Sequence, residues 1–408
     1  MDGKKDRLGL ILTGGGARSA YQVGVLKAIS EMVPKGSPLP FPVITGTSAG
    51  AVSATVLASR AGDFRVAVRG LEDVWANFRV SQVFRADGAS MLRAGLHWLL
   101  AFVSSGLLLP PPRSLFDNTP LRELLTKTIP FAGVSRGIKK GHLHALGICA
   151  TGFTNGRPIT FFQGHKDIVP WSRSVSGSRR VNLSFDHLMA SLSIPFLFPA
   201  QLIDGEYWGD GAMRQSTPLS PAINLGADRL LIIGVRAKGY EGTFGTVGGQ
   251  QIPTAAQIFG YMLDTLFMDQ IYADLEQLQR LNEIVRHAPV AAATGLRTIR
   301  AITIAPAEDL REIATRHLRD LPYGLRALLR TMGAQKPAAS SLASYLMFES
   351  PYTRELIALG HADAMTRRDE ILEFLHGGSV APSSTLGPAS PRVVAELRSA
   401  EKKAAEAQ

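Results

Sequence analysis

The first part of the chain alternates between short apolar runs and segments with helical spacing. Residues 8–12 and 41–45 are compact apolar runs, which are typical of buried strands. Each is followed by a segment that suits a helix, at 20–32 and at 49–59. Strand, loop, helix, strand, turn and helix in this order predict a central, mostly parallel sheet with right-handed crossovers, and so an α/β fold.

The remaining pattern predicts more strands and a helical C-terminal part. Further strands are expected at 143–151, 159–162, 229–235 and 298–304, and further helices at 64–79, 185–193, 255–287 and 308–376. We therefore divide the chain into a domain at 8–235, a mainly helical C-terminal extension at 236–377 and a tail at 378–408. The tail is rich in Ser, Pro, Gly and Ala, so we expect it to be mobile.

A long excursion at 80–120 contains the least polar stretch of the chain, at 94–112. This stretch carries no formally charged side chain, but Arg93 and Arg113 flank it. We interpret it as an apolar flap or a membrane-contacting helix; a buried core helix explains the pattern equally well. Its length is near the minimum for a membrane span and it contains His97, which makes a spanning helix the weaker alternative.

The formal net charge of +10 favours acidic partners, either anionic lipid or nucleic acid. The basic segments at 138–144 and 173–180 are short and match no nucleic-acid-binding module, so no nucleic-acid partner is expected. The sequence shows no metal-ligand motif, and we expect neither a metal nor another cofactor. Because no signal-peptide pattern is present, we expect a cytoplasmic protein with peripheral contact to the inner face of the membrane. The single cysteine, Cys149, lies in an apolar run and is interpreted as a buried structural residue.

The first chemical signal is the sequence Gly46-Thr47-Ser48-Ala49-Gly50, placed between an expected strand and an expected helix. A sharp turn of this kind holds a serine oxygen clear of the backbone, and small neighbours avoid clashes in it. The start of the following helix offers free amide groups to a developing negative charge. The alternative is a plain glycine-flanked turn, but this context predicts that Ser48 is a nucleophile.

The second signal is the glycine-rich loop that follows the first strand, Gly14-Gly15-Gly16-Ala17-Arg18. Three successive glycines allow backbone amides to face one point without interference from side chains. Such a loop suits either a dinucleotide phosphate or an oxyanion hole for acyl transfer. The dinucleotide interpretation is weak, because Ser19 occupies the third glycine position and no acidic residue follows at the required distance.

The third signal is Asp210-Gly211-Ala212, an acidic residue followed by a small turn. Alone it indicates no more than a loop. Its value depends on the other two signals, since an aspartate near a nucleophilic serine is able to act as its base.

Together these blocks resemble the patatin-like phospholipases. The matching blocks are G-G-G-A-R at 14–18, G-T-S-A-G at 46–50, A-S-L-S-I-P at 190–195 and D-G-A at 210–212, in the order of that family. The resemblance covers about residues 8–235, which would form a patatin-like catalytic domain with a mostly parallel central sheet. One departure is Ser19, where the family usually has glycine.

The resemblance implies a lipid acyl hydrolase with a Ser–Asp dyad. Ser48 would attack the ester carbonyl of a phospholipid or related lipid, and Asp210 would accept its proton. The oxyanion would be held in the glycine loop and the helix start, at Gly14, Gly15, Gly16, Ala17, Arg18 and Ala49. The glycines Gly46 and Gly50 would shape the serine turn, and Gly211 and Ala212 the aspartate turn.

Two other functions remain open from the sequence. One is an esterase for small esters with a Ser–His–Asp triad, since nine histidines are present, although none lies in a recognisable motif. The other is a basic peripheral membrane-binding protein without enzymatic activity.

Overall fold

The computed structural model describes residues 6–104, 113–174, 176–237, 252–287, 296–334 and 340–377. The expected mobile tail at 378–408 lies outside the described residues, and so does the part of the apolar stretch at 105–112.

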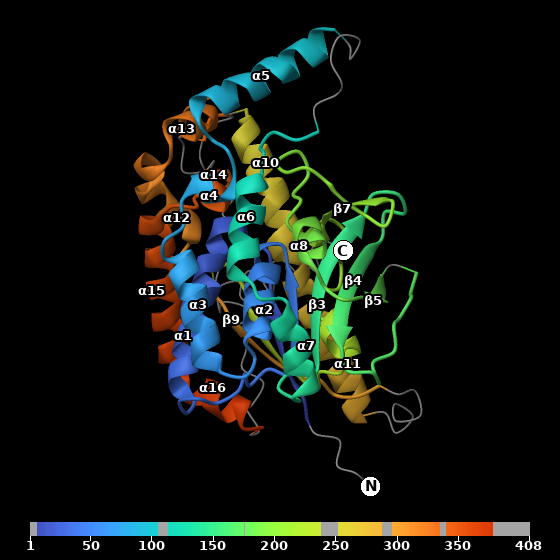
Figure 1. The fold of residues 1–408 in the computed structure, drawn as a ribbon. Helices are drawn as coiled ribbons and strands as arrows, with labels where there is room; N and C mark the ends of the chain where they lie inside the picture. Colours follow the sequence, from blue (N-terminus) through green and yellow to red (C-terminus); the bar gives the residue numbers. More distant parts are fainter. Residues whose placement is uncertain are drawn as a thin grey trace, which may run out of the picture.

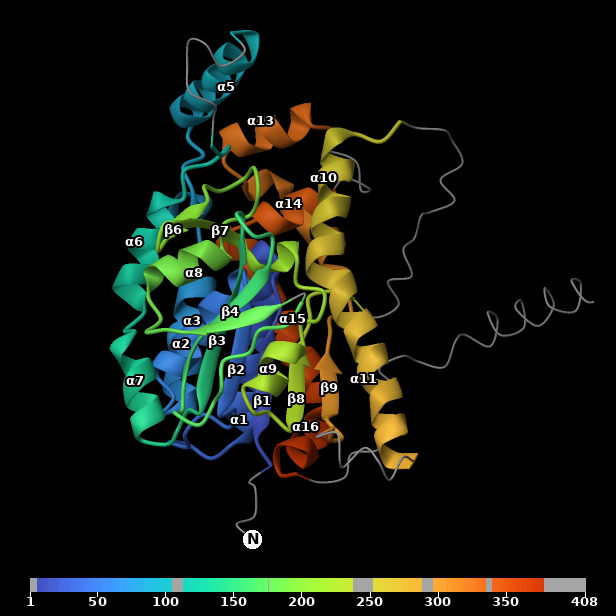
Figure 2. The same ribbon diagram turned by 90° about the vertical axis from the view of Figure 1, so that its right-hand side faces the viewer.

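A nine-stranded sheet runs through the centre of the described chain in the order β5-β4-β3-β2-β1-β8-β9, with β7 paired to β3 and β6 to β7 (Figures 1 and 2). The strands are β1 (Leu8–Leu12), β2 (Val43–Thr47), β3 (Ala145–Gly152), β4 (Pro158–Gly164), β5 (Gly177–Arg180), β6 (Gln201–Ile203), β7 (Glu206–Asp210), β8 (Arg229–Ile233) and β9 (Arg300–Ile304). Strands β3, β2, β1, β8 and β9 pair in parallel, and β4 and β7 each pair antiparallel to β3. The prediction of an α/β fold with a mostly parallel sheet is confirmed.

Helices cover both faces of the sheet (Figures 1 and 2). They are α1 (Ala20–Met32), α2 (Ala49–Ser59), α3 (Phe64–Trp75), α4 (Val80–Val83), α5 (Gly88–Val103), α6 (Thr119–Thr128), α7 (Ala132–Lys139), α8 (Phe185–Ser191), α9 (Ser220–Asn224), α10 (Ala255–Asp264), α11 (Gln270–His287), α12 (Leu310–Arg316), α13 (Tyr323–Thr331), α14 (Ser340–Leu346), α15 (Ser350–Thr366) and α16 (Arg368–Leu375). The larger core joins the sheet to the layer of α1, α2, α3 and α15, and a smaller core joins its other face to α9 and α11.

The C-terminal region shares the core of the first domain. Strand β9 extends the parallel sheet beside β8. Helix α15 packs directly on α1, where Gly24 and Gly360 each face the backbone of the other helix: added Cβ atoms would lie 2.0 Å and 2.2 Å from carbonyl oxygens of Ile357 and Tyr21. Residues beyond 235 therefore complete the same sheet and core.

The observed elements refine several expected boundaries. Strand β2 begins at Val43, two residues later than expected, and continues to Thr47, because its pairing with β3 extends to Cys149. The helix expected at 255–287 consists of α10 and α11 joined by a π-helical turn, η3 (Thr265–Asp269). The short strands β5, β6 and β7 were not expected, since their sequences lack a long apolar pattern.

The expected excursion at 80–120 contains α4, α5 and the start of α6. Helix α5 projects from the end of the molecule near α13 (Figures 1 and 2). Four of its apolar side chains are exposed, namely Leu96, Trp98, Leu100 and Val103, so the buried-core alternative is wrong for the described part of this stretch. No helix in the described ranges is both long enough and apolar enough to cross a bilayer.

Candidate active site

Ser48 lies in the turn between β2 and α2, at the carboxyl end of the parallel strands. Its φ of 54° and ψ of −130° place a non-glycine residue in a sparsely populated backbone region. Such strain is typical of a serine held on a sharp strand-to-helix turn. The side chain is buried, with the residue only 1% exposed.

The two glycines around Ser48 are required by close backbone contacts. A Cβ on Gly46 would lie 2.6 Å from Cα of Ala51, within the turn itself. A Cβ on Gly50 would lie 2.2 Å from the carbonyl oxygen of Leu12, at the end of the neighbouring strand β1. The turn is therefore sterically compatible with glycine alone at both positions.

Sheet pairing brings Asp210 to the same place. In the register of β2 with β3, Thr47 lies opposite Cys149, and in that of β3 with β7, Ala150 lies opposite Asp210. Asp210 ends β7 and is followed by a short 3-10 turn, η2 (Gly211–Met213), whose Ala212 amide donates to Oδ1 of Asp210 at 2.9 Å. Residues that are far apart in the sequence thus meet at one edge of the sheet.

The environment of Asp210 raises its pKa from the ordinary value to about 7. Burial is the largest cause, because it disfavours the charged carboxylate, while the Ser48 hydroxyl and the Ala212 amide act in the opposite direction. The Ser48 hydroxyl is thus near enough to the carboxylate to influence its pKa, and Oδ2 is buried with no hydrogen-bond partner among the described residues. Carboxylates with such a raised pKa occur often at functional sites.

The block A-S-L-S-I-P holds both residues by their backbones. Oγ of Ser191 accepts a hydrogen bond from the Ser48 amide at 2.9 Å and donates one to the Cys149 carbonyl at 2.6 Å. The carbonyl of Ser193 accepts from the Asp210 amide at 2.9 Å. This block is part of the resemblance described above, but no role was predicted for Ser191 or Ser193.

The glycine loop lies directly beside Ser48. A Cβ on Gly14 would lie 3.0 Å from Cβ of Ser48 and 2.4 Å from Cδ1 of Phe267, whose side chain comes from the π-helical turn η3. Gly16 has a φ of +54° and meets the Tyr345 carbonyl, which would lie 2.4 Å from an added Cβ. Glycine is therefore needed for contact with Ser48 on one side and with α14 on the other.

Comparison with known families gives one match, which covers about half of the chain. The family model of the patatin-like phospholipases matches residues 10–223, just over half of the chain. The chain belongs to the patatin-like phospholipase family. Membership implies a lipid acyl hydrolase. A search among curated proteins finds none that matches this chain.

Two solved structures are similar to this patatin-like chain at low identity. VipD from Legionella pneumophila is 12% identical, with a TM-score of 0.29, over 93% of this chain and 78% of its own. ExoU from Pseudomonas aeruginosa, in complex with SpcU, is 17% identical, with a TM-score of 0.25, over 97% of this chain and 84% of its own.

Arg18 of the patatin-like glycine loop points away from Ser48 into the C-terminal region. Its guanidinium donates to Asp264 Oδ1 at 2.9 Å, to Ser341 Oγ at 2.9 Å and to Ser344 Oγ at 2.7 Å. It also lies over the ring of Tyr345, 4.0 Å from the centroid. The side chain therefore anchors the loop to α10 and α14, while the place of Arg18 in the oxyanion site stays a prediction. Ala17 and Ser19 are buried in the same turn.

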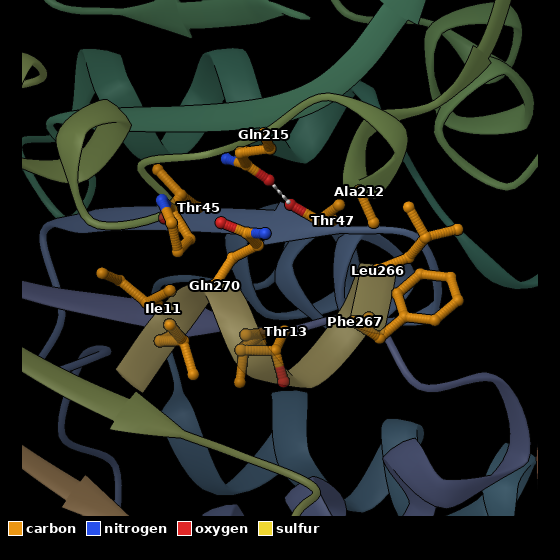
Figure 3. A pocket seen from close by; sticks show the side chains of 13 residues that line it. Ile11, Thr13, Thr45, Thr47, Ala212, Gln215, Leu266, Phe267 and Gln270 are labelled. Carbon is orange, nitrogen blue, oxygen red and sulfur yellow. Dashed lines mark hydrogen bonds between the residues drawn. The ribbon is translucent and has the colours of Figure 1, made fainter. Parts of the chain in front are cut away.

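A narrow pocket opens beside Ser48 and Asp210, on the side of the sheet that faces η3 and α11 (Figure 3). Thr47 and Ala212, the neighbours of Ser48 and Asp210, line it together with Gly14 and Phe267. Thr47 donates to Oε1 of Gln215 at 2.9 Å across the pocket. Cys149 is buried as expected, and burial raises the pKa of its thiol.

No histidine is among the groups that shift the pKa of Asp210. His187, which lies in a helix start as expected, interacts with Oγ of Ser184 at 2.9 Å and packs against the ring of Phe161. The described contacts therefore give His187 a structural position in the capping of α8.

One group of described residues has the spacing of a metal site, namely His144, His165 and Asp167. It lies at the amino end of β3, whereas Ser48 follows the carboxyl end of the parallel strand β2, so the group is at the opposite edge of the sheet. Burial, followed by the charge of Arg7, lowers the pKa of His144 to about 4. This group takes no part in the candidate active site.

Proposed function

We propose that this chain is a serine hydrolase that cleaves carboxylic ester bonds of phospholipids or related lipids with Ser48 and Asp210. The observation that carries the proposal is the buried carboxylate of Asp210, which is near Ser48 and whose Oδ2 has no hydrogen-bond partner among the described residues. A carboxylate with a pKa near 7 suits a general base at neutral pH.

In the first half of the reaction, Ser48 Oγ attacks the ester carbonyl carbon and Asp210 takes the hydroxyl proton. The negative charge forms on the carbonyl oxygen. Backbone amides of Gly14, Gly15, Gly16, Ala17 and Ala49 are the proposed donors to it, helped by the positive end of α2. The intermediate collapses when Asp210 gives the proton to the leaving alcohol, which leaves an acyl-serine.

In the second half, water attacks the acyl carbonyl while Asp210 takes one of its protons. Collapse of this intermediate breaks the bond to Ser48 Oγ, which recovers the proton from Asp210. The fatty acid leaves and the enzyme is restored. The same carboxylate acts as base and acid in each half, so no histidine is required.

A change of Ser48 to alanine tests the proposal. The purified protein is incubated with mixed phospholipid vesicles, and released fatty acids are measured by mass spectrometry. A fluorophosphonate probe should label the native protein and not Ser48→Ala. Ser53→Ala is the matched control, because Ser53 is also buried on α2 and its hydroxyl has no partner in the described structure. Equal labelling of native protein and Ser48→Ala would refute the assignment.

We also propose that α5 contacts the lipid surface. Its exposed leucines, valine and tryptophan, with Arg93 as its formally charged residue, suit the interface of an anionic membrane. Leu96→Asp with Leu100→Asp should weaken flotation with phosphatidylglycerol vesicles. Val66→Asp is the control, since Val66 is similarly exposed on α3. Unchanged flotation of the folded double variant would contradict membrane contact through α5.

A further inference from the structure

An apolar pocket of about 250 Å³ lies between α5 and the C-terminal helices. Its lining includes Trp98 of α5 and Phe196 of the segment after α8. It also includes Phe259 of α10, Leu328 of α13 and Leu346 of α14. Most of these walls come from outside residues 10–223, the part that matches the family model.

Every residue that lines this pocket is apolar. Apolar cavities of about 150 Å³ stay free of water and bind small hydrocarbons, as the engineered cavity that takes benzene shows. Apart from the indole N–H of Trp98 and the weakly accepting sulfur of Met332, the side chains that line the larger pocket here carry no hydrogen-bonding group. Its chemistry therefore selects a hydrocarbon.

Two short connections join the pocket to the candidate active site. Ser193, whose carbonyl holds the Asp210 amide, precedes Phe196 and Leu197 of the pocket wall by only a few residues. Helix α14 presents Leu342 and Leu346 to the pocket, while its Tyr345 carbonyl meets Gly16 of the glycine loop. A hydrocarbon in the pocket therefore lies on the elements that hold Ser48, Asp210 and the glycine loop in place.

The surface around the pocket suits a lipid bilayer. Helices α5 and α13 contact each other and contain no carboxylate side chain, while Arg93, Arg326 and Arg330 are exposed on them. Exposed apolar side chains continue from α5 onto α13 and α10, at Tyr323, Ile258, Tyr261 and Met262. The arginines are complementary to anionic lipid head groups, and the exposed apolar side chains are complementary to the hydrocarbon layer beneath those head groups.

We propose that this pocket receives the acyl chain of a lipid ester and so determines the chain length that the enzyme prefers. The proposal rests on the proposed hydrolase function for its substrate. The selection of substrate would then depend largely on residues of the C-terminal extension, whereas the reacting groups belong to residues 8–235.

Binding is tested in the Ser48→Ala protein, so that no turnover occurs. The probe is cis-parinaric acid, a fluorescent fatty acid, and its Kd is measured by titration. Leu328→Trp and Met332→Trp fill the pocket from half-buried positions and should each raise the Kd at least about tenfold. Leu359→Trp is the matched control, a half-buried leucine on α15 that does not line the pocket, and should leave the Kd unchanged. Circular dichroism and thermal unfolding identify the folded variants.

Activity is tested with the same substitutions in the native background. The ratio of kcat/KM for a sixteen-carbon ester to that for a four-carbon ester should fall at least about tenfold in the two pocket variants and not in Leu359→Trp. An unchanged Kd and an unchanged ratio in a folded pocket variant would overturn the proposal. Probe binding that both pocket variants weaken, in a native protein that hydrolyses no ester, would support the pocket and refute the hydrolase function alone.

Discussion

Two aspartates of the described chain, Asp264 and Asp210, are buried, and their surroundings differ sharply. Asp264 accepts hydrogen bonds from Arg18 at 2.9 Å, from Ser341 Oγ at 2.7 Å and from Tyr345 at 3.0 Å. Asp210 accepts one backbone amide at 2.9 Å, and its second oxygen has no hydrogen-bond partner among the described residues. The Asp264 carboxylate is paired with a cation and two hydroxyl donors. Within the described residues, the Asp210 carboxylate has no cation beside it, and one of its oxygens has no donor.

This difference is the one expected between a structural carboxylate and the reactive one that we propose. A buried charge with a cation and several donors is compensated, and it fixes the elements that supply those donors. A buried carboxylate without a cation holds its proton more tightly, and here the pKa of Asp210 rises to about 7. Asp264 therefore anchors the glycine loop to α10 and α14. Asp210 is the proton acceptor in the function proposed above. Four experiments test this contrast.

The largest effect is expected from Asp210→Asn. An amide cannot take the Ser48 proton, so kcat should fall by about 10³- to 10⁴-fold while the protein stays folded. Initial rates of lipid-ester hydrolysis give the measurement. Asp274→Asn is the matched control, because burial also raises the pKa of Asp274, to about 6, but its carboxylate accepts from the Leu219 amide instead. Comparable losses in both variants would show that proton transfer is not specific to Asp210.

A smaller effect, on stability, is expected from Asp264→Asn. The substitution leaves the buried guanidinium of Arg18 without its counter-ion, which should lower the free energy of unfolding by about 3–5 kcal/mol. Urea denaturation measures it. Glu72→Gln removes the more exposed ion pair with Lys27 and should cost less than about 1 kcal/mol. If both substitutions cost the same, the Arg18–Asp264 pair does not anchor the loop as described.

The pH dependence of the reaction should follow Asp210. Its pKa of about 7 means that the carboxylate is ionised above this pH and protonated below it. Because only the ionised form accepts a proton, kcat/KM should reach a plateau above pH 8 and fall about tenfold for each pH unit below 6. Measuring kcat/KM for a fluorescent ester across this pH range gives the midpoint of the fall. A midpoint near pH 4, the range of an ordinary aspartate, would contradict the raised pKa of Asp210.

The smallest effect is expected from single replacement of each histidine by alanine. His187→Ala removes a side chain that caps α8 and should lower the free energy of unfolding by about 1 kcal/mol. Turnover should change only a few-fold in every folded variant, because the proposed cycle uses Asp210 alone. A histidine variant as inactive as Ser48→Ala would replace the dyad with a triad.

The sequence located the elements that are formed by local interactions. Gly46 and Gly50 mark the turn that holds Ser48, since contacts within a few residues and with the adjacent strand exclude a side chain there. The alternation of apolar runs and helical spacing indicated the parallel sheet, because each period reflects which face of an element is buried. The ordered blocks indicated the family, which the match over residues 10–223 confirms.

The tertiary structure decided what lies together from distant parts of the chain. The registers of β2 with β3 and of β3 with β7 bring Asp210 to Ser48, and no local pattern encodes a register between strands so far apart in sequence. Arg18 looked like a loop residue, but packing of α10 and α14 gives it Asp264 as a partner. The apolar pocket exists only where α5, α10, α13 and α14 meet, so residues that each read as ordinary helix positions form one cavity through packing alone.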